Sequence, residues 1–189
     1  MIKATQIRKG MVILHESQPC KVVHFKHTVT GRGSASIPAK LKNILDGSTS
    51  EVTFRSDDKV EKVFLSEEDM EFLYVDGDDY VFMNQESYEQ ISINKEEIEE
   101  ITGYLVENAF CKIDLYEGKP IGVTPPTNVQ LTVEDTEPVI KGATAAGNVT
   151  KPATLQTGLT IQVPMFVDKG DTVIVNTVTG EYSGRPGRN

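Results

Sequence analysis

Short apolar segments separated by turn residues are the feature that most constrains the fold of this 189-residue chain. Most of these segments alternate with a period of two, which is typical of strands with one buried face, and they are too short for the helices of a bundle. We therefore predict an all-β chain of small antiparallel barrels or sandwiches. The predicted strands are Met11–Leu14, Lys21–Phe25, Glu51–Phe54, Phe72–Val75, Tyr80–Met83, Tyr104–Val106, Cys111–Tyr116, Ile121–Val123, Val129–Val133, Leu159–Val163 and Thr172–Val175.

Turn signals join several of these segments. Asp76-Gly77-Asp78-Asp79 is the strongest hairpin signal, because glycine tolerates the positive φ that a tight turn requires, and Glu117-Gly118 separates a second pair. One segment, Lys95–Ile101, is predicted to form a helix of one or two turns. Pro125-Pro126 has no backbone donors and marks a junction between two folding units.

Charge divides the chain into thirds of different sign. Residues 1–64 contain 11 Lys+Arg and 6 Asp+Glu (+5), residues 65–127 contain 3 and 16 (−13), and residues 128–189 contain 5 and 6 (−1). A basic first third beside an acidic second third indicates that one end contacts RNA phosphate, and a solvated acidic face without a partner is the alternative. We predict three domains with these same bounds, each near the lower size limit for an independent core.

The composition indicates a cytoplasmic protein that does not enter a membrane. The longest apolar stretch near the N-terminus, Met11–Leu14, is shorter than the apolar region of a signal peptide, and no segment approaches the roughly 20 apolar residues of a membrane span. Cys20 and Cys111 form no framework of spacings, so buried, reduced thiols are predicted.

A run of small residues around one cation lies between the second and third predicted strands. It contains Thr30, Gly31, Arg32, Gly33 and Ser34. The two glycines let the backbone approach another surface closely, and the guanidinium is always charged. Arg32 is therefore predicted to be presented to a partner, and an ordinary flexible hairpin loop is the alternative.

No catalytic site, metal site or cofactor is predicted. Cys20, His24 and His27 are compactly spaced, but the two histidines point to opposite faces of a strand and no fourth ligand is evident. The carboxylates of residues 96–100 fit a solvated helix face, and residues 31–34 lack the spacing of a P-loop. An enzyme that uses these carboxylates or histidines, and a generic RNA- or protein-binding array of barrels, are the competing functions.

Several motifs, in order along almost the whole chain, resemble the elongation factor P family. The first is Thr30-Gly31-Arg32-Gly33, at the place of the family's Pro-Gly-Lys-Gly loop. The others are Lys40–Gly47, Thr53–Glu61, Tyr80–Asn84, Val123–Pro126, Lys151–Gly158, Val163–Phe166 and Thr179–Arg185.

The resemblance implies an SH3-like barrel of the KOW type followed by two OB-fold barrels, in an L-shaped, tRNA-like arrangement. It implies a non-enzymatic, monomeric factor that binds the 70S ribosome between the P and E sites, beside P-site peptidyl-tRNA and rRNA. There it stimulates peptide-bond formation at polyproline stalls. We expect secondary RNA contacts from Lys40, Lys42, Tyr182 and Arg185, with surface charge or a core aromatic as the alternative reading of each.

Two departures from the family pattern affect the predicted sites. The tip residue is Arg32 rather than lysine, so the resemblance implies rhamnosylation by an arginine rhamnosyltransferase, with an unmodified Arg32 as the alternative. Gly142-Ala143-Thr144 replaces the family's Gly-Asp-Thr, and the loss of this carboxylate weakens any claim of codon contact. The elongation factor P-like paralogue is the second choice.

Overall fold

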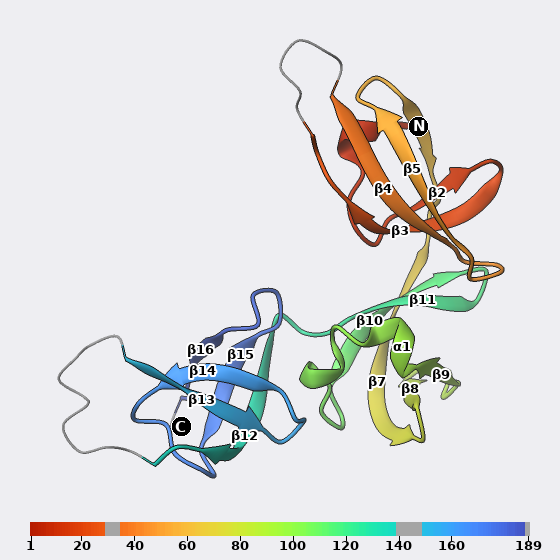
Figure 1. Ribbon diagram of the computed structural model, residues 1–189. Coiled ribbons are helices and arrows are strands. Elements are labelled where there is room, and N and C mark those ends of the chain that lie inside the picture. The colour runs from red at the N-terminus through yellow and green to blue at the C-terminus, as the bar shows by residue number, and fades with distance from the viewer. Residues whose placement is uncertain (29–34, 139–148, 188–189) are drawn as a thin grey trace. The chain divides into compact units, whose positions relative to one another are not determined.

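The computed structural model describes residues 1–28, 35–138 and 149–187 (Figure 1). These residues form three β-sheets, and their only helical elements are one short α-helix and two 3-10 helices. The chain divides into two compact units, residues 1–66 with 115–121 and residues 67–114 with 122–189. The prediction of an all-β chain is confirmed.

The first sheet has six strands in the order β1-β6-β2-β3-β4-β5. Val22 and Leu41 are opposite each other on β3 and β4 and are fully buried, so alternate residues of this hairpin face the core. The turn between β2 and β3 places Glu16 at φ 50° and Ser17 at φ 62°, and two positive φ values are the geometry that matches the twist of a two-residue hairpin. The elements are β1 (Ile2–Lys3), η1 (Ala4–Gln6), β2 (Val12–His15), β3 (Gln18–Phe25), β4 (Ser36–Asn43), β5 (Thr49–Arg55) and β6 (Lys59–Lys62).

The second sheet has the order β11-β10-β7-β8-β9. Gly77, at φ 62°, occupies the predicted hairpin turn between β7 and β8. Phe72 and Phe82 are paired across this hairpin, are buried, and have ring centroids 5.5 Å apart. The elements are β7 (Ser66–Asp76), β8 (Asp79–Asn84), β9 (Gln90–Asn94), α1 (Lys95–Ile98), η2 (Thr102–Tyr104), β10 (Phe110–Tyr116) and β11 (Lys119–Thr124).

The third sheet has the order β14-β13-β12-β15-β16. Its core consists of alternate residues of these strands, among them Leu131, Leu155 and Val175. Lys151 is the exception in this apolar set, because its side chain is 2% exposed and its Nζ donates to the carbonyl of Glu137 at 2.5 Å. The strands are β12 (Asn128–Thr136), β13 (Thr150–Leu155), β14 (Thr160–Pro164), β15 (Thr172–Asn176) and β16 (Tyr182–Gly184).

The segment at η2 joins the second and third sheets within their common unit. Tyr104 and Val106 pack against the core of the third sheet, and Thr157 Oγ1 donates to the carbonyl of Gly103 at 2.6 Å. The predicted strand Tyr104–Val106 is therefore wrong. Its apolar side chains are explained by contact with a neighbouring sheet, and this segment forms the end of η2 and a connection.

The tip of the β10–β11 hairpin belongs to the first unit. Lys119 Nζ donates to the carbonyl of Ile44 at 2.7 Å, and Lys21 Nζ donates to the carbonyl of Ile121 at 2.5 Å. Each side therefore supplies one ammonium group and one backbone acceptor, which fixes residues 115–121 against the first sheet.

The predicted helix at Lys95–Ile101 is confirmed only over Lys95–Ile98, after which the chain forms a turn. Asn94 caps it, because its side chain accepts from the backbone N–H of Glu96 at 3.1 Å. Six strands were not predicted: β1, β4, β6, β9, β13 and β16.

Candidate nucleic-acid interface

The loop that carries Arg32 connects β3 to β4 in the first sheet. The five residues predicted for this site, Thr30, Gly31, Arg32, Gly33 and Ser34, lie outside the described residues. Their predicted role is therefore untested by the structure, which describes the base of the loop on both sides.

Backbone hydrogen bonds hold the two ends of this loop together. The N–H of Thr28 donates to the carbonyl of Ser36 at 3.1 Å, and the N–H of Ser36 donates back at 3.2 Å. The carbonyl of Ala35 accepts from the N–H of Ser56 at 2.9 Å, which ties the returning end to the segment after β5. The base of the loop is therefore fixed by main-chain groups on both sides.

Basic side chains lie on one face of the β3–β4 hairpin. Lys21 lies directly opposite Lys42, and His24 lies directly opposite Lys40. A β-bulge between the two pairs shifts the register by one residue, which keeps both pairs on one face. Lys40 is exposed and Lys42 is half-buried. We call Lys21, His24, Lys40 and Lys42 the basic ladder.

The electrostatics of the basic ladder favour an anionic partner. Like charges directly opposite on neighbouring strands are destabilising, so the Lys21–Lys42 pair costs stability unless something offsets it. The bond from Lys21 to the carbonyl of Ile121 provides part of this compensation, and Glu51 of β5 lies opposite Lys40 on its other side. A phosphate backbone over this face would neutralise the remaining charge.

The two predicted contacts near the C-terminus are largely occupied within the third sheet. Tyr182 is half-buried and packs against the core. Arg185 Nη2 donates to the carbonyl of Phe166 and to Asp171 Oδ2, both at 3.0 Å, and its guanidinium carbon lies 4.4 Å from the centroid of the Phe166 ring. Both residues lie near the C-terminus and outside the basic ladder. Their contact with RNA stays a prediction.

The two cysteines have the properties of buried structural thiols. Burial, followed by the charges of Asp46 and Glu16, raises the pKa of Cys20, and burial raises the pKa of Cys111 to about 11. Both therefore stay protonated at neutral pH, which disfavours nucleophilic chemistry.

Within the described residues, no group of three or more His, Cys, Asp or Glu side chains gathers to hold a metal ion. None of the described helices is long and apolar enough to span a membrane.

Lys21 is the residue of this surface that the sequence analysis missed. The signal that could have identified it is the symmetry of Lys21 and Lys42 about the loop, but this symmetry has meaning only once the register of β3 and β4 is known.

Three small β-sheets, the first with a basic face on the hairpin that carries the loop, define an all-β protein built from small sheets. Comparison with known proteins narrows this class. Residues 3–60 match the "Elongation factor P (EF-P) KOW-like domain", residues 65–123 match the "Elongation factor P (EF-P) OB domain", and residues 129–185 match "Elongation factor P, C-terminal". The chain belongs to the elongation factor P family.

One curated relative agrees with this assignment over the full length. Elongation factor P of Desulfovibrio desulfuricans is 43% identical over 185 residues, which cover 98% of this chain and 100% of that protein. Among solved structures, the chain is similar to eukaryotic translation initiation factor 5A from Methanococcus jannaschii, with 16% identity and a TM-score of 0.41 over 66% of this chain and 91% of that one.

Proposed function

We propose that this chain is a translation elongation factor that binds the 70S ribosome between the P and E sites and stimulates peptide-bond formation at polyproline stalls. The observation that carries the proposal is the match of three elongation factor P domain models, in order, from residue 3 to residue 185. The factor works as a cytoplasmic monomer without a cofactor. Its domains are residues 1–64 (KOW-type, with the loop), 65–127 (acidic OB-type) and 128–189 (C-terminal OB-type).

Arg32 acts by position at the end of P-site peptidyl-tRNA. Proline reacts slowly because its ring fixes φ and constrains its nitrogen, so the productive alignment is rarely sampled. A guanidinium placed beside phosphates and sugar hydroxyls restrains that end of the tRNA and lowers the entropic part of the barrier. No acid, base or nucleophile from this chain is required, so the factor assists the ribosomal peptidyl-transferase centre and is not itself an enzyme.

The basic ladder supplies secondary contacts to tRNA or rRNA. Lys40 and Lys42 lie on one face of the strand that leads out of the loop, and binding to phosphate relieves the repulsion between Lys42 and Lys21 on the opposite strand. Tyr182 and Arg185 are weaker candidates, because packing and the contacts with Phe166 and Asp171 occupy much of their surface.

Arg32 is the site of a rhamnose modification made by an arginine rhamnosyltransferase. In the chemistry that extends a tip lysine, the side-chain amine attacks an activated carboxyl group and the activating group leaves; arginine has no such amine. Intact-mass analysis of the protein from its native host tests this proposal: an added deoxyhexose on the peptide that contains Arg32 is expected. An unmodified mass with full activity would favour the bare guanidinium instead.

Replacing Arg32 by alanine tests the proposed function. In a cell that lacks the native factor, rescue of a polyproline-stalling reporter should fall sharply with Arg32→Ala, while ribosome binding persists through the rest of the protein. Lys62→Ala is the matched control, because it removes one exposed positive charge from β6 of the same sheet. Unchanged rescue with Arg32→Ala would contradict the proposal.

The elongation factor P-like paralogue is the alternative function. It is favoured by the arginine at the tip and by Ala143 in place of an acidic residue, a position that lies outside the described residues. Rescue of the polyproline reporter in cells that lack only the main factor separates the two. A generic RNA-binding protein would show no dependence on proline at all.

A further inference from the structure

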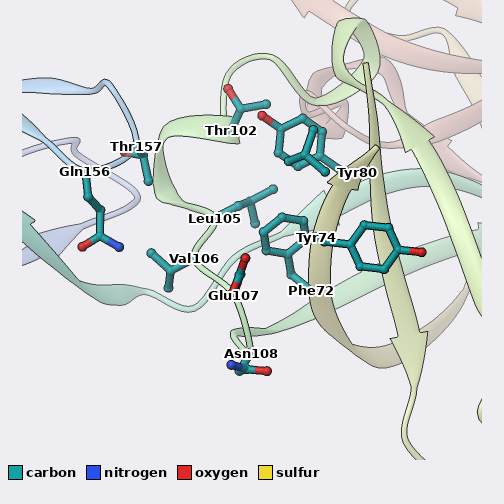
Figure 2. A pocket seen from close by; sticks show the side chains of 11 residues that line it. Phe72, Tyr74, Tyr80, Thr102, Leu105, Val106, Glu107, Asn108, Gln156 and Thr157 are labelled. Carbon is teal, nitrogen blue, oxygen red and sulfur yellow. The ribbon is translucent and has the colours of Figure 1, made fainter. Parts of the chain in front are cut away.

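The second unit, residues 67–114 with 122–189, contains a cavity of about 760 Å³ between η2, the β7–β8 hairpin and the turn after β13. We call it the η2 cavity. Figure 2 shows three aromatic residues, Phe72, Tyr74 and Tyr80, on the β7–β8 side, with Gln156 on the opposite side. The rings of Phe72 and Tyr80 have centroids 5.6 Å apart at 31°, and Tyr74 is 47% exposed. The aromatic wall is therefore partly open to solvent.

The polar groups of the η2 cavity are a carboxylate and two carboxamides. Glu107 and Asn108 are exposed and adjacent, and the N–H of Asn108 donates to the carbonyl of Phe72 at 2.8 Å, which anchors this turn beside the aromatic wall. Gln156 Oε1 accepts from the N–H of Thr132 at 2.8 Å, so its Nε2 is left to donate. Figure 2 shows this nitrogen on the side of Gln156 that faces the cavity.

One carboxylate lines the η2 cavity, and the segment that supplies most of its lining is acidic. Glu107 is the only charged residue among the described residues that line it. Residues 65–127 contain 16 acidic side chains and only three lysines. Two of those lysines are occupied, because Lys112 pairs with Glu67 at 2.7 Å and Lys119 donates to a backbone carbonyl. A phosphate backbone would thus meet carboxylates with few cations to offset them.

We propose that the η2 cavity binds a basic segment of a protein partner, with an arginine or lysine side chain against the exposed ring of Tyr74 and its charge facing Glu107. A cation over an aromatic face is attracted by the ring quadrupole, and a nearby carboxylate adds a charge-assisted hydrogen bond. The Nε2 of Gln156 donates to a backbone carbonyl of the same segment. This inference goes beyond the proposed function and does not depend on Arg32.

Single-stranded RNA is the other occupant that an aromatic wall could attract, because bases stack on exposed rings. Such sites combine the rings with a positively charged groove that follows the backbone. The lining described above offers a carboxylate in its place, so charge complementarity favours the basic peptide.

Fluorescence anisotropy on the full-length protein tests the proposal. The probes are a labelled peptide of alternating arginine and serine, the same peptide with glutamate in place of arginine, and a uridine-rich single-stranded RNA. The arginine peptide should bind with an affinity that weakens as salt rises, and the glutamate peptide should not bind. RNA that binds the basic ladder should leave the arginine peptide in place. Absence of binding by the arginine peptide, or binding of the RNA with displacement of that peptide, would overturn the proposal.

Matched variants locate the binding site. Glu107→Gln and Tyr74→Leu should each weaken binding of the arginine peptide about two- to fivefold, the range expected for one exposed ion pair or one exposed cation–π contact. Glu89→Gln and Tyr88→Leu make the same changes in the exposed β8–β9 turn, which does not line the cavity, and should leave the affinity unchanged. Equal weakening by both pairs would show non-specific attraction to the acidic surface and would refute the site.

Discussion

The close approach of Gly103 to the third sheet predicts that its replacement by alanine destabilises the second unit. A Cβ on Gly103 would lie 3.1 Å from Leu159 Cβ, 3.3 Å from Cδ1 and 3.5 Å from Cδ2. Two of these distances are shorter than an ordinary contact, so either the leucine or η2 must shift. Tyr104, in the same segment, packs against the core of the third sheet, and this packing limits how far η2 can move.

Two opposing effects set the size of the loss. Overpacking of a close contact costs about 1–3 kcal/mol of stability. Alanine also lowers the conformational entropy of the unfolded chain, which stabilises the fold by about 0.4–1 kcal/mol. We therefore expect Gly103→Ala to lower the free energy of unfolding by about 1–2 kcal/mol. Urea unfolding followed by far-UV circular dichroism should show this as a lower midpoint with an unchanged slope.

Two further variants decide whether the contact is the cause. Gly187→Ala is the matched control, because a Cβ there meets nothing within 4 Å, and its unfolding free energy should stay within about 0.5 kcal/mol of the original. Leu159→Ala removes two of the three close atoms, so in the double variant the effect of Gly103→Ala should shrink by at least about 0.5 kcal/mol. Equal losses at both glycines, or strict additivity with Leu159→Ala, would refute the reasoning.

Three further predictions concern single side chains. Burial raises the pKa of Cys111 to about 11, so the protonated thiol stabilises the fold below its unfolded pKa, and this stabilisation is lost as pH rises through about 11. In urea unfolding from pH 8 to 11, the difference in unfolding free energy between the original protein and Cys111→Ala should therefore decline. Arg185→Ala removes the ion pair with Asp171 and the stacking on an aromatic ring, and a loss of about 1 kcal/mol is expected in the same assay, with little recovery in the lysine variant. Lys119→Met keeps the apolar stem but leaves the carbonyl of Ile44 without this donor, so amide exchange of residues 115–121 should accelerate; unchanged exchange would refute the contact.

The strands that could be predicted from the sequence are those whose own residues specify them. The β7–β8 hairpin combines aromatic and β-branched residues with a glycine at the positive φ of its turn, and the β10–β11 hairpin has the same form around Gly118. Here local propensity and tertiary structure agree, so the prediction needed no knowledge of the neighbouring strands.

The strands that were missed are specified by their neighbours. β4 and β13 each contain an exposed proline, Pro38 and Pro152, and each lies between two other strands in its sheet. Proline and lysine are depleted in strands, so these segments give a weak strand signal. In β13, Lys151 also places a buried ammonium group where an apolar side chain is expected. Such segments become strands because pairing on both sides satisfies the remaining backbone groups, which a single sequence does not reveal.

The candidate interface was predictable only in part for the same reason. Lys40 and Lys42 were predicted as secondary RNA contacts, with surface charge as the alternative, but the residue opposite each of them depends on register. Without the bulge after Val22, the residue opposite Lys40 would be Val23, and the basic ladder would lose His24. A one-residue irregularity therefore decides which side chains share the face, and nothing in the local sequence specifies it.

The proposed function and the stability of the first sheet depend on different groups. The loop with Arg32 is closed by main-chain hydrogen bonds between Thr28 and Ser36, and the core beneath it is built from alternate apolar residues of the flanking strands. Both sets of contacts are made by described residues on either side of the loop. A substitution at Arg32 therefore changes the charge that the loop presents without removing a described contact of the fold. For this reason, loss of polyproline rescue in Arg32→Ala would report on the action of the loop at the ribosome, provided that the protein still unfolds at the same urea concentration.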